Sequence, residues 1–500
     1  MPAADSFEVN LHLHSSTRHP IELHRTGPKD WRYNVRISAI HRHTVCEKGS
    51  KDIILKILRE YDCIEVKGDD HNEIFNETDF FTYSISTADL NTLGFTINVF
   101  SKVTDDSTAS HLGQGHITPL QLSGSGGTLI VPLIDKSFQT IGTISVDYLL
   151  VKPWHHPLNT PSGQDRHTRG LKDQKKLDGS YVCGHRGAGE SFGTTKTWKY
   201  PENTISAFKA AHEMGIDFAE MDVQVSKDNV PVIFHDTTVK LCLETFPSSP
   251  SKESKSTFFE IPVKDLTSEQ MKAIKVWEWS EMAANQEARN KGLKRKHDEN
   301  NTMSSSSKPD VATDYVLFPT LGEALSEVPQ ELGFFIEMKY PFQEMYEESI
   351  DHLCIDKNQF VDSILQVLFD KAGARKILLG CFDPDICVLC QSKQSRHPVF
   401  LITQGQNTIW DPYLDIRART TEMAVAFAKS ENLDGIHIFS SLLFDRPANI
   451  KKILQTGLTL IAWGHENDKP EKKKWLVEHG VHCVQVDDIF ESTRNHTTSD

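Results

Sequence analysis

The chain has 500 residues, a length that favours two or three domains and allows a large buried core. Hydrophobic residues make up 38% of it and charged residues 25%, which excludes a collagen-like chain, a wholly disordered chain and a small disulfide-stapled scaffold. The formal charge of −15 disfavours nonspecific binding to nucleic acid or to an anionic membrane surface.

The beginning of the sequence, MPAADSFEVNLHLH, lacks the basic and apolar regions of a secretory signal peptide, and no apolar run approaches the ~18 residues that span a bilayer. The nine cysteines are an odd number without a repeated spacing, which favours a reducing compartment over a disulfide framework. Cys387 and Cys390 form a C-x-x-C pair, but they lie in an apolar, helix-like stretch, so we interpret them as packing residues. We therefore expect a soluble, cytoplasmic protein with no membrane span.

Apolar and polar residues alternate in several runs between residues 7 and 151, a pattern typical of half-buried strands. In residues 7–13, for example, Phe, Val and Leu alternate with Glu, Asn and His. Such strands, separated by glycine-rich turns, predict a β-sandwich domain over residues 1–151. His12 and His14 could chelate zinc as an H-x-H pair, but they fall on the polar side of their strand and we expect both to be solvated.

A different organisation follows the β region. Residues 152–179 are rich in Pro, Gly and charge and predict a linker. Beyond it, amphipathic helical stretches separate eight apolar, strand-like runs, at residues 181–185, 216–222, 333–337, 376–381, 398–402, 435–439, 458–463 and 483–486. Eight such units close most simply into a (β/α)8 barrel, here over residues 180–492. An open doubly wound sheet is the alternative, but the sequence has no G-x-G-x-x-G fingerprint to support it.

One connection in the barrel, residues 244–313, is far longer than an ordinary barrel loop. It contains two polar tracts, of which the second predicts a disordered surface insertion near residues 284–311. Within it, Lys294, Arg295 and Lys296 could serve nuclear import, but we favour a solvated run of charges.

Ionisable residues gather at the carboxyl ends of the first three barrel strands, where such barrels carry their reacting groups. They are His185 and Arg186 after strand one, Glu220 and Asp222 on one side of strand two, His235 beyond a short extension of it, and Glu337 and Lys339 at the end of strand three. A single carboxylate there is often a helix cap. Several ionisable residues together favour a functional site, because buried like charges repel unless a cation or a substrate compensates them.

The residue types indicate which chemistry this site would serve. Glu220, Asp222 and Glu337 offer hard oxygen ligands, which suit Mg²⁺ or Ca²⁺. Together with Arg186 and Lys339, such a cation would form a positive pocket for a phosphate. Two histidines beside it can divide proton transfer between the attacking oxygen and the leaving alkoxide. The pattern therefore predicts phosphodiester cleavage.

Five motifs occur in order along the barrel: H-R-G at 185–187, P-E-N-T at 201–204, E-x-D-V-x-x-S at 220–226, H-D at 235–236 and E-x-K at 337–339. As an ordered set they resemble the glycerophosphodiester phosphodiesterase family, over about residues 181–490. The resemblance implies that the two histidines act as acid and base, that the three carboxylates hold the metal, and that Arg186 and Lys339 contact phosphate.

More narrowly, the segments 382–387 and 400–405 and the pair Trp463-Gly464 resemble the cytosolic glycerophosphocholine phosphodiesterases of animals. This resemblance implies a small-molecule substrate, glycerophosphocholine, cleaved to glycerol 3-phosphate and choline. Trp463 ends strand seven, where its ring face could contact the trimethylammonium group or could pack at the barrel top. Those relatives also carry a starch-binding-like domain with no clear counterpart here, so we expect a shorter form without carbohydrate binding.

Two other functions stay open on the sequence alone. A lysophospholipase-D-like activity in the same site would require an apolar groove for an acyl chain. A non-catalytic scaffold could bind a protein partner through the β-sandwich domain and the insertion, but nothing in a scaffold requires both histidines and all three carboxylates.

Overall fold

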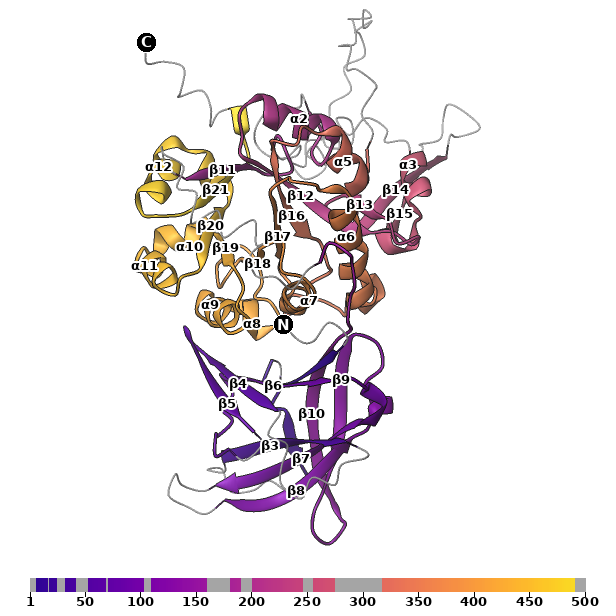
Figure 1. The fold of residues 1–500 in the computed structure, drawn as a ribbon, viewed down its shortest axis with the longest axis vertical. Coiled ribbons are helices and arrows are strands. Elements are labelled where there is room, and N and C mark those ends of the chain that lie inside the picture. The colour runs from indigo at the N-terminus through magenta and orange to yellow at the C-terminus, as the bar shows by residue number, and fades with distance from the viewer. Residues whose placement is uncertain are drawn as a thin grey trace, which may run out of the picture.

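The computed structural model describes residues 6–16, 18–24, 32–41, 53–68, 71–102, 109–159, 180–189, 200–245, 255–274 and 317–490. Within these residues the chain forms an N-terminal antiparallel β domain and a (β/α)8 barrel, which pack against each other (Figure 1). The predicted insertion at 284–311 and residues 160–179 of the predicted linker lie outside the described residues.

The N-terminal domain is a ten-stranded sheet in the order β3-β7-β8-β9-β10-β1-β6-β4-β5, with β2 paired to β10. Its strands are β1 (Phe7–Leu13), β2 (Ile21–Leu23), β3 (Arg32–His41), β4 (Ile54–Arg59), β5 (Asp62–Lys67), β6 (Phe80–Thr87), β7 (Leu93–Lys102), β8 (Ser110–Ile117), β9 (Gly126–Ile134) and β10 (Thr140–Val151). Along β7 every second residue is buried, as the alternating sequence predicts. The sheet curls on itself around one apolar core, which confirms the predicted β-sandwich (Figure 1).

Eight parallel strands close the barrel, because β11 pairs with both β12 and β21. The strands are β11 (Tyr181–Gly184), β12 (Phe218–Val225), β16 (Gly333–Met338), β17 (Ile377–Cys381), β18 (Val399–Thr403), β19 (Gly435–Phe439), β20 (Thr459–Trp463) and β21 (Cys483–Val486). Each overlaps one predicted apolar run, and the closure confirms the barrel over the open sheet. The runs are continuous rather than alternating because barrel strands are buried on both faces.

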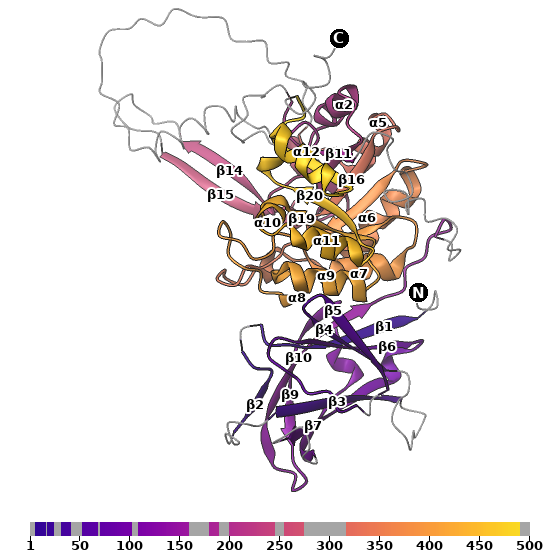
Figure 2. The same ribbon diagram turned by 90° about the vertical axis from the view of Figure 1, so that its left-hand side faces the viewer.

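Helices surround the barrel strands: α2 (Ile205–Glu213), α3 (Ser268–Ala273), α5 (Leu321–Glu327), α6 (Lys357–Lys371), α7 (Pro384–Lys393), α8 (Ile416–Arg419), α9 (Thr421–Ser430), α10 (Ser440–Asp445), α11 (Ala448–Gln455) and α12 (Pro470–Glu478). Cys387 and Cys390 are buried, free thiols of α7, which confirms their packing role. Strand β13 (Pro231–Ile233) pairs with β12, and β14 (Thr238–Thr245) and β15 (Lys255–Pro262) form a ribbon that projects from the barrel (Figure 2). No helix within the described residues is long and apolar enough to cross a membrane.

The N-terminal domain packs on the helices at the side of the barrel (Figure 2). Asn358, at the start of α6, donates to Ser125 Oγ at 2.6 Å and to the Leu150 carbonyl at 2.7 Å, and accepts from the Lys152 amide at 2.9 Å. Apolar side chains of β4, β6 and β10 join the core between the barrel strands and their helices. The docking surface is therefore buried and specifically hydrogen-bonded.

The prediction that His12 is solvated is wrong. The residue is 5% exposed, its ring lies 5.1 Å from that of Phe80, and Arg417 of α8 covers the same phenyl ring at 4.8 Å. Strand β1 is central in its sheet and the barrel covers its outer face, so both faces are buried. His14 is also mostly buried, with Nε2 2.8 Å from Asp147.

Residues 152–159, which the sequence assigns to the linker, lie along the barrel. The indole of Trp154 packs edge-on against Phe369 of α6 at 5.1 Å, and Nε2 of His156 lies 3.0 Å from Asp370. This part of the chain extends the contact between the two domains.

Candidate active site

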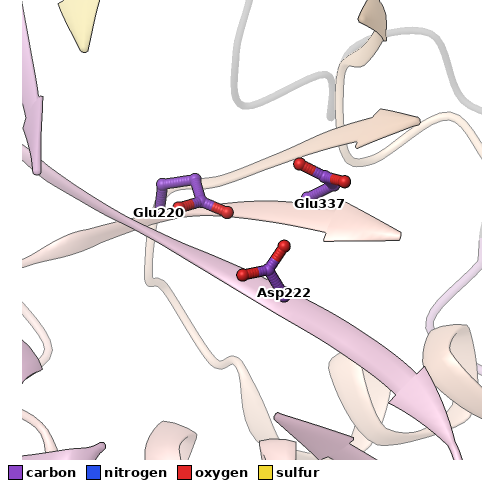
Figure 3. Close-up of side chains that lie close together, drawn as sticks. All are labelled: Glu220, Asp222 and Glu337. Carbon is purple, nitrogen blue, oxygen red and sulfur yellow. The ribbon is translucent and has the colours of Figure 1, made fainter. Parts of the chain in front are cut away.

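Three carboxylates meet at the carboxyl ends of β12 and β16, as Figure 3 shows. Glu220 and Asp222 are two residues apart on β12 and therefore point to the same side, and Glu337 pairs in register with Asp222 on the adjacent strand. Each offers one oxygen atom within 4.8 Å of the others. The structure thus brings together the three residues that the sequence predicts as metal ligands, hereafter the acidic triad.

The electrostatics of the acidic triad favour a bound cation. Glu220 and Asp222 are 2% and 1% exposed. Burial, and then the charge of Asp222, raises the pKa of Glu220. Burial opposes the ionisation of Asp222 as well, but Lys339, His235 and Arg186 outweigh it and lower its pKa. Oε1 of Glu220 is buried without a hydrogen-bond partner among the described residues, so a hard divalent cation fits this donor set.

Lys339 supplies positive charge beside the triad. Its Nζ lies 2.7 Å from Glu337 Oε1 and 3.3 Å from Asp222 Oδ1. Burial would lower the pKa of this ammonium, but the charges of Glu337 and Asp222 raise it. Lys339 is therefore a fixed cation at physiological pH, close enough to the triad to contact an anion bound there.

Arg186 is held at the same edge by its backbone and its side chain. Its amide donates to Glu220 Oε2 at 2.7 Å, and its guanidinium donates to Glu202 at 2.8 Å and lies 3.6 Å from Asp222. The chain turns sharply here, with φ of +48° at Arg186 and +94° at Gly187. A Cβ at Gly187 would lie 2.8 Å from a side-chain atom of α2, which explains the glycine of the H-R-G motif.

His185 is oriented by a carboxylate that follows the last barrel strand. Its Nδ1 lies 2.5 Å from Asp487 Oδ1, and its Nε2 faces Glu220 Oε2 at 3.9 Å. Burial would lower the pKa of His185, but Asp487 outweighs it and raises the pKa to about 9. The raised pKa favours the imidazolium form of His185 beside the Asp487 carboxylate, and its Nε2 lies toward the acidic triad.

His235 approaches the triad from the segment after β13. Its side chain is 33% exposed and its Nδ1 lies 2.8 Å from Asp236 Oδ1. The amide of the preceding residue, Phe234, donates to the Asp222 carbonyl at 2.9 Å, and the charge of His235 contributes to lowering the pKa of Asp222. Each of the two predicted catalytic histidines has a carboxylate at Nδ1.

Aromatic rings surround Trp463 at the end of β20. Its ring centroid lies 5.0 Å from Phe439, 5.7 Å from Trp410 and 6.2 Å from Phe382. Phe382 also lies under Lys339, with the ammonium 6.0 Å from the ring centroid. Trp463 is thus part of an aromatic cluster (Phe382, Trp410, Phe439 and Trp463) that reaches Lys339 beside the acidic triad.

Three residues of the site received no role from the sequence. Asn203 donates to Asp222 Oδ2 at 2.8 Å and accepts from the Asp222 amide at 3.2 Å, so it fixes this carboxylate. Glu202 orients Arg186, and Asp487 orients His185. Asn203 and Glu202 lie in the P-E-N-T motif. Asp487 directly follows strand eight, so the rule used for strands one to three would have identified it.

Comparisons with known proteins agree with this geometry. A model of the glycerophosphoryl diester phosphodiesterase family matches residues 185–491, and a GDE1-like C2 domain model matches residues 50–155. Human glycerophosphocholine phosphodiesterase GPCPD1 is 30% identical over 97% of this chain and 72% of its own length. Glycerophosphocholine phosphodiesterase GDE1 of Candida albicans is 32% identical over 75% of this chain and 33% of its own. An Oleispira antarctica phosphodiesterase, solved with the product sn-glycerol-3-phosphate, is 17% identical with a TM-score of 0.41 and covers 64% of this chain and 98% of its own.

Proposed function

This chain belongs to the glycerophosphoryl diester phosphodiesterase family and is a phosphoric diester hydrolase, and we propose that it cleaves glycerophosphocholine to glycerol 3-phosphate and choline. One observation carries the proposal: the acidic triad, whose oxygens lie within 4.8 Å of one another, lies beside His185 and two fixed cations, and the charge of His235 contributes to lowering the pKa of Asp222. The names of the similar proteins support the choice of substrate.

Glu220, Asp222 and Glu337 would hold one divalent cation, Mg²⁺ or Ca²⁺. The all-oxygen donor set and the unpartnered Oε1 of Glu220 support this assignment. When bound, the cation supplies a Lewis acid for a phosphate oxygen. Arg186 and Lys339 would bind the other phosphate oxygens, since both lie within 4 Å of Asp222 and present donors at the edge of the triad.

The two histidines would divide the proton transfers. Asp487 stabilises the imidazolium of His185, which suits this residue to protonate the choline oxygen as its bond to phosphorus breaks. His235, oriented by Asp236, would accept the proton of the attacking oxygen. These two transfers complete the reaction if water attacks directly. If the glycerol hydroxyl attacks, they yield a cyclic phosphate, and its hydrolysis would use the same two histidines with their roles reversed: His185 would accept the proton of water and His235 would protonate the glycerol oxygen.

The aromatic cluster would recognise the head group. A trimethylammonium is attracted to the face of an indole by roughly 1–2 kcal/mol when the contact is desolvated, a roughly 5- to 30-fold effect. We expect Trp463→Ala to reduce kcat/KM for glycerophosphocholine by such a factor and to reduce kcat/KM for glycerophosphoethanolamine much less. The activity of Trp463→Phe should lie between those of wild type and Trp463→Ala. Equal reduction for both substrates would reject head-group recognition by this ring.

We propose that the protein works in the cytoplasm on small diesters rather than at a membrane. The seven cysteines whose side chains the structure describes are free thiols, which supports a reducing compartment. The net charge of −15 is unfavourable for binding anionic lipid surfaces or nucleic acid.

The direct experiment is an assay of choline release by the purified full chain. We expect release from glycerophosphocholine and none from the double variant His185→Ala, His235→Ala. Higher kcat/KM for lysophosphatidylcholine would instead identify a lysophospholipase-D-like enzyme. No release from any diester would support a scaffold.

A further inference from the structure

The loop that follows β20 brings a surface histidine to the carboxylate behind His185. His465 begins the 3-10 turn η5 (His465–Asp468), and 71% of its side chain is exposed. Its Nδ1 nevertheless lies 2.8 Å from Oδ2 of Asp487, whose other oxygen lies 2.5 Å from Nδ1 of His185. The buried carboxylate is therefore held between two imidazoles, one at the active site and one at the surface.

The same turn fixes the backbone of Asp487. Oδ1 of Asp468 accepts hydrogen bonds from the amides of Asp487 and Asp488 at 2.8 and 3.0 Å. Asn467, at 0% exposure, donates to one carbonyl of β20 and one of β21 at 3.2 and 2.8 Å. With the main chain fixed in this way, the remaining freedom of Asp487 lies in its side chain.

His465 restricts that freedom. A carboxylate rotates about its Cβ–Cγ bond, and the orientation of Oδ1 toward His185 depends on what holds Oδ2. Asp487 is 9% exposed, and its Oδ2 is buried without a hydrogen-bond partner of standard geometry among the described residues. The ring of His465, with Nδ1 2.8 Å away, is its close ion-pair neighbour, and water has little access to replace it. A small misplacement of a proton-transfer group is enough to slow the chemical step strongly.

We propose that His465 is a positioning residue: by holding Oδ2 of Asp487 it keeps Oδ1 aligned with His185, and so the imidazole of His185 stays turned toward the acidic triad. This inference rests on the function proposed above. His465 acts through Asp487 and makes no contact with the diester, so its removal affects the chemical step and leaves substrate binding unchanged.

A double-mutant cycle tests this role. His465→Ala, Asp487→Asn and the combined variant are compared with wild type in steady-state assays of glycerophosphocholine, glycerophosphoethanolamine and glycerophosphoinositol. We expect His465→Ala to lower kcat about tenfold with KM within about twofold, as for the loss of one close charged contact that orients a proton-transfer group. In the Asp487→Asn background the same change should have almost no further effect.

Two further variants separate positioning from stability. Asn at position 465 can present an N–H near the place of Nδ1, so His465→Asn should recover most of the lost kcat. His479→Ala, which removes an exposed histidine that stacks on Trp475 of α12, should match wild type. Melting temperatures of all variants are measured alongside.

The outcomes are distinct. Unchanged kcat in His465→Ala, a rise in KM alone, or losses that multiply in the double variant would overturn the positioning role while leaving the proposed function intact. No rescue by His465→Asn, in a protein that melts like wild type, would also overturn it. A wild type that cleaves none of the three diesters would refute the proposed function, and this inference with it.

Discussion

Replacing Asp487 by Asn should change the pH dependence of catalysis, because it removes the charge that keeps His185 protonated. Burial by itself would lower the pKa of His185, and the carboxylate outweighs burial and raises the pKa from 6.5 to about 9. This difference in pKa corresponds to roughly 3 kcal/mol of free energy in favour of the protonated form of His185. Without the charge, the pKa of His185 returns to 6.5 or below.

The loss of activity then depends on pH. Wild-type His185 keeps its proton until the pH rises through about 9, whereas the variant loses it near or below 6.5. At about pH 8, no more than roughly 3% of the variant molecules would carry the proton, so kcat should fall at least roughly 30-fold. Below about pH 6.5 the deficit should narrow, because His185 gains its proton in the variant as well.

The assay is choline release from glycerophosphocholine between about pH 5.5 and about pH 8.5. Asp488→Asn serves as the matched control, since Asp488 is the adjacent carboxylate and caps the amide of Phe490 at 2.9 Å. A constant ratio of wild-type to Asp487→Asn activity over this range would refute the assignment of His185 as the acid.

Acidification should weaken the fold, because burial lowers the pKa of His12 from 6.5 to about 3. The stability that the neutral His12 side chain contributes is complete above pH 6.5 and is lost as the pH falls toward 3. Urea denaturation at about pH 7 and about pH 5.5 should show wild type losing about 1.3 kcal/mol more than His12→Phe, and equal losses would contradict this. Asn358→Ala leaves groups of Ser125, Leu150 and Lys152, at the contact between the domains, without their hydrogen bonds to this side chain. It should lower the free energy of unfolding by roughly 2–4 kcal/mol, against less than about 0.5 kcal/mol for Ser363→Ala on the same helix. Lys339→Met removes the cation beside the acidic triad. After chelation this variant should have a lower melting temperature than wild type, and Mg²⁺ should raise its melting temperature by more. An equal rise in the two proteins would refute the idea that Lys339 compensates the negative charge of the triad.

The barrel could be predicted from the sequence because its signal is local. A parallel strand covered on both faces appears as a short apolar run, and residues such as 435–439 and 483–486 carry that signal whatever surrounds them. The carboxyl ends of parallel strands meet at one face, so Glu220 and Glu337 could be placed together although they are 117 positions apart in the sequence.

Other features depend on partners that no local pattern reveals. The position of Asp487 after strand eight would have placed it at the barrel mouth, but its pairing with His185, across 302 positions of sequence, depends on side-chain orientations that the residues around it do not show. His12 alternates with apolar residues like a solvent-facing side chain, and it is buried because a second domain covers that face of the sheet. Burial of this kind is a property of the domain contact rather than of the strand.

The measurement that tests the central claim most directly is calorimetric titration of the chelated full chain with Mg²⁺, followed by choline release at the same ion concentrations. The account predicts one ion per chain, activity that returns over the same range as binding, and loss of both in Asp222→Asn but not in Asp228→Asn, which changes a carboxylate at the turn after the same strand. Full activity after exhaustive chelation, or undiminished binding of the ion by Asp222→Asn, would contradict it.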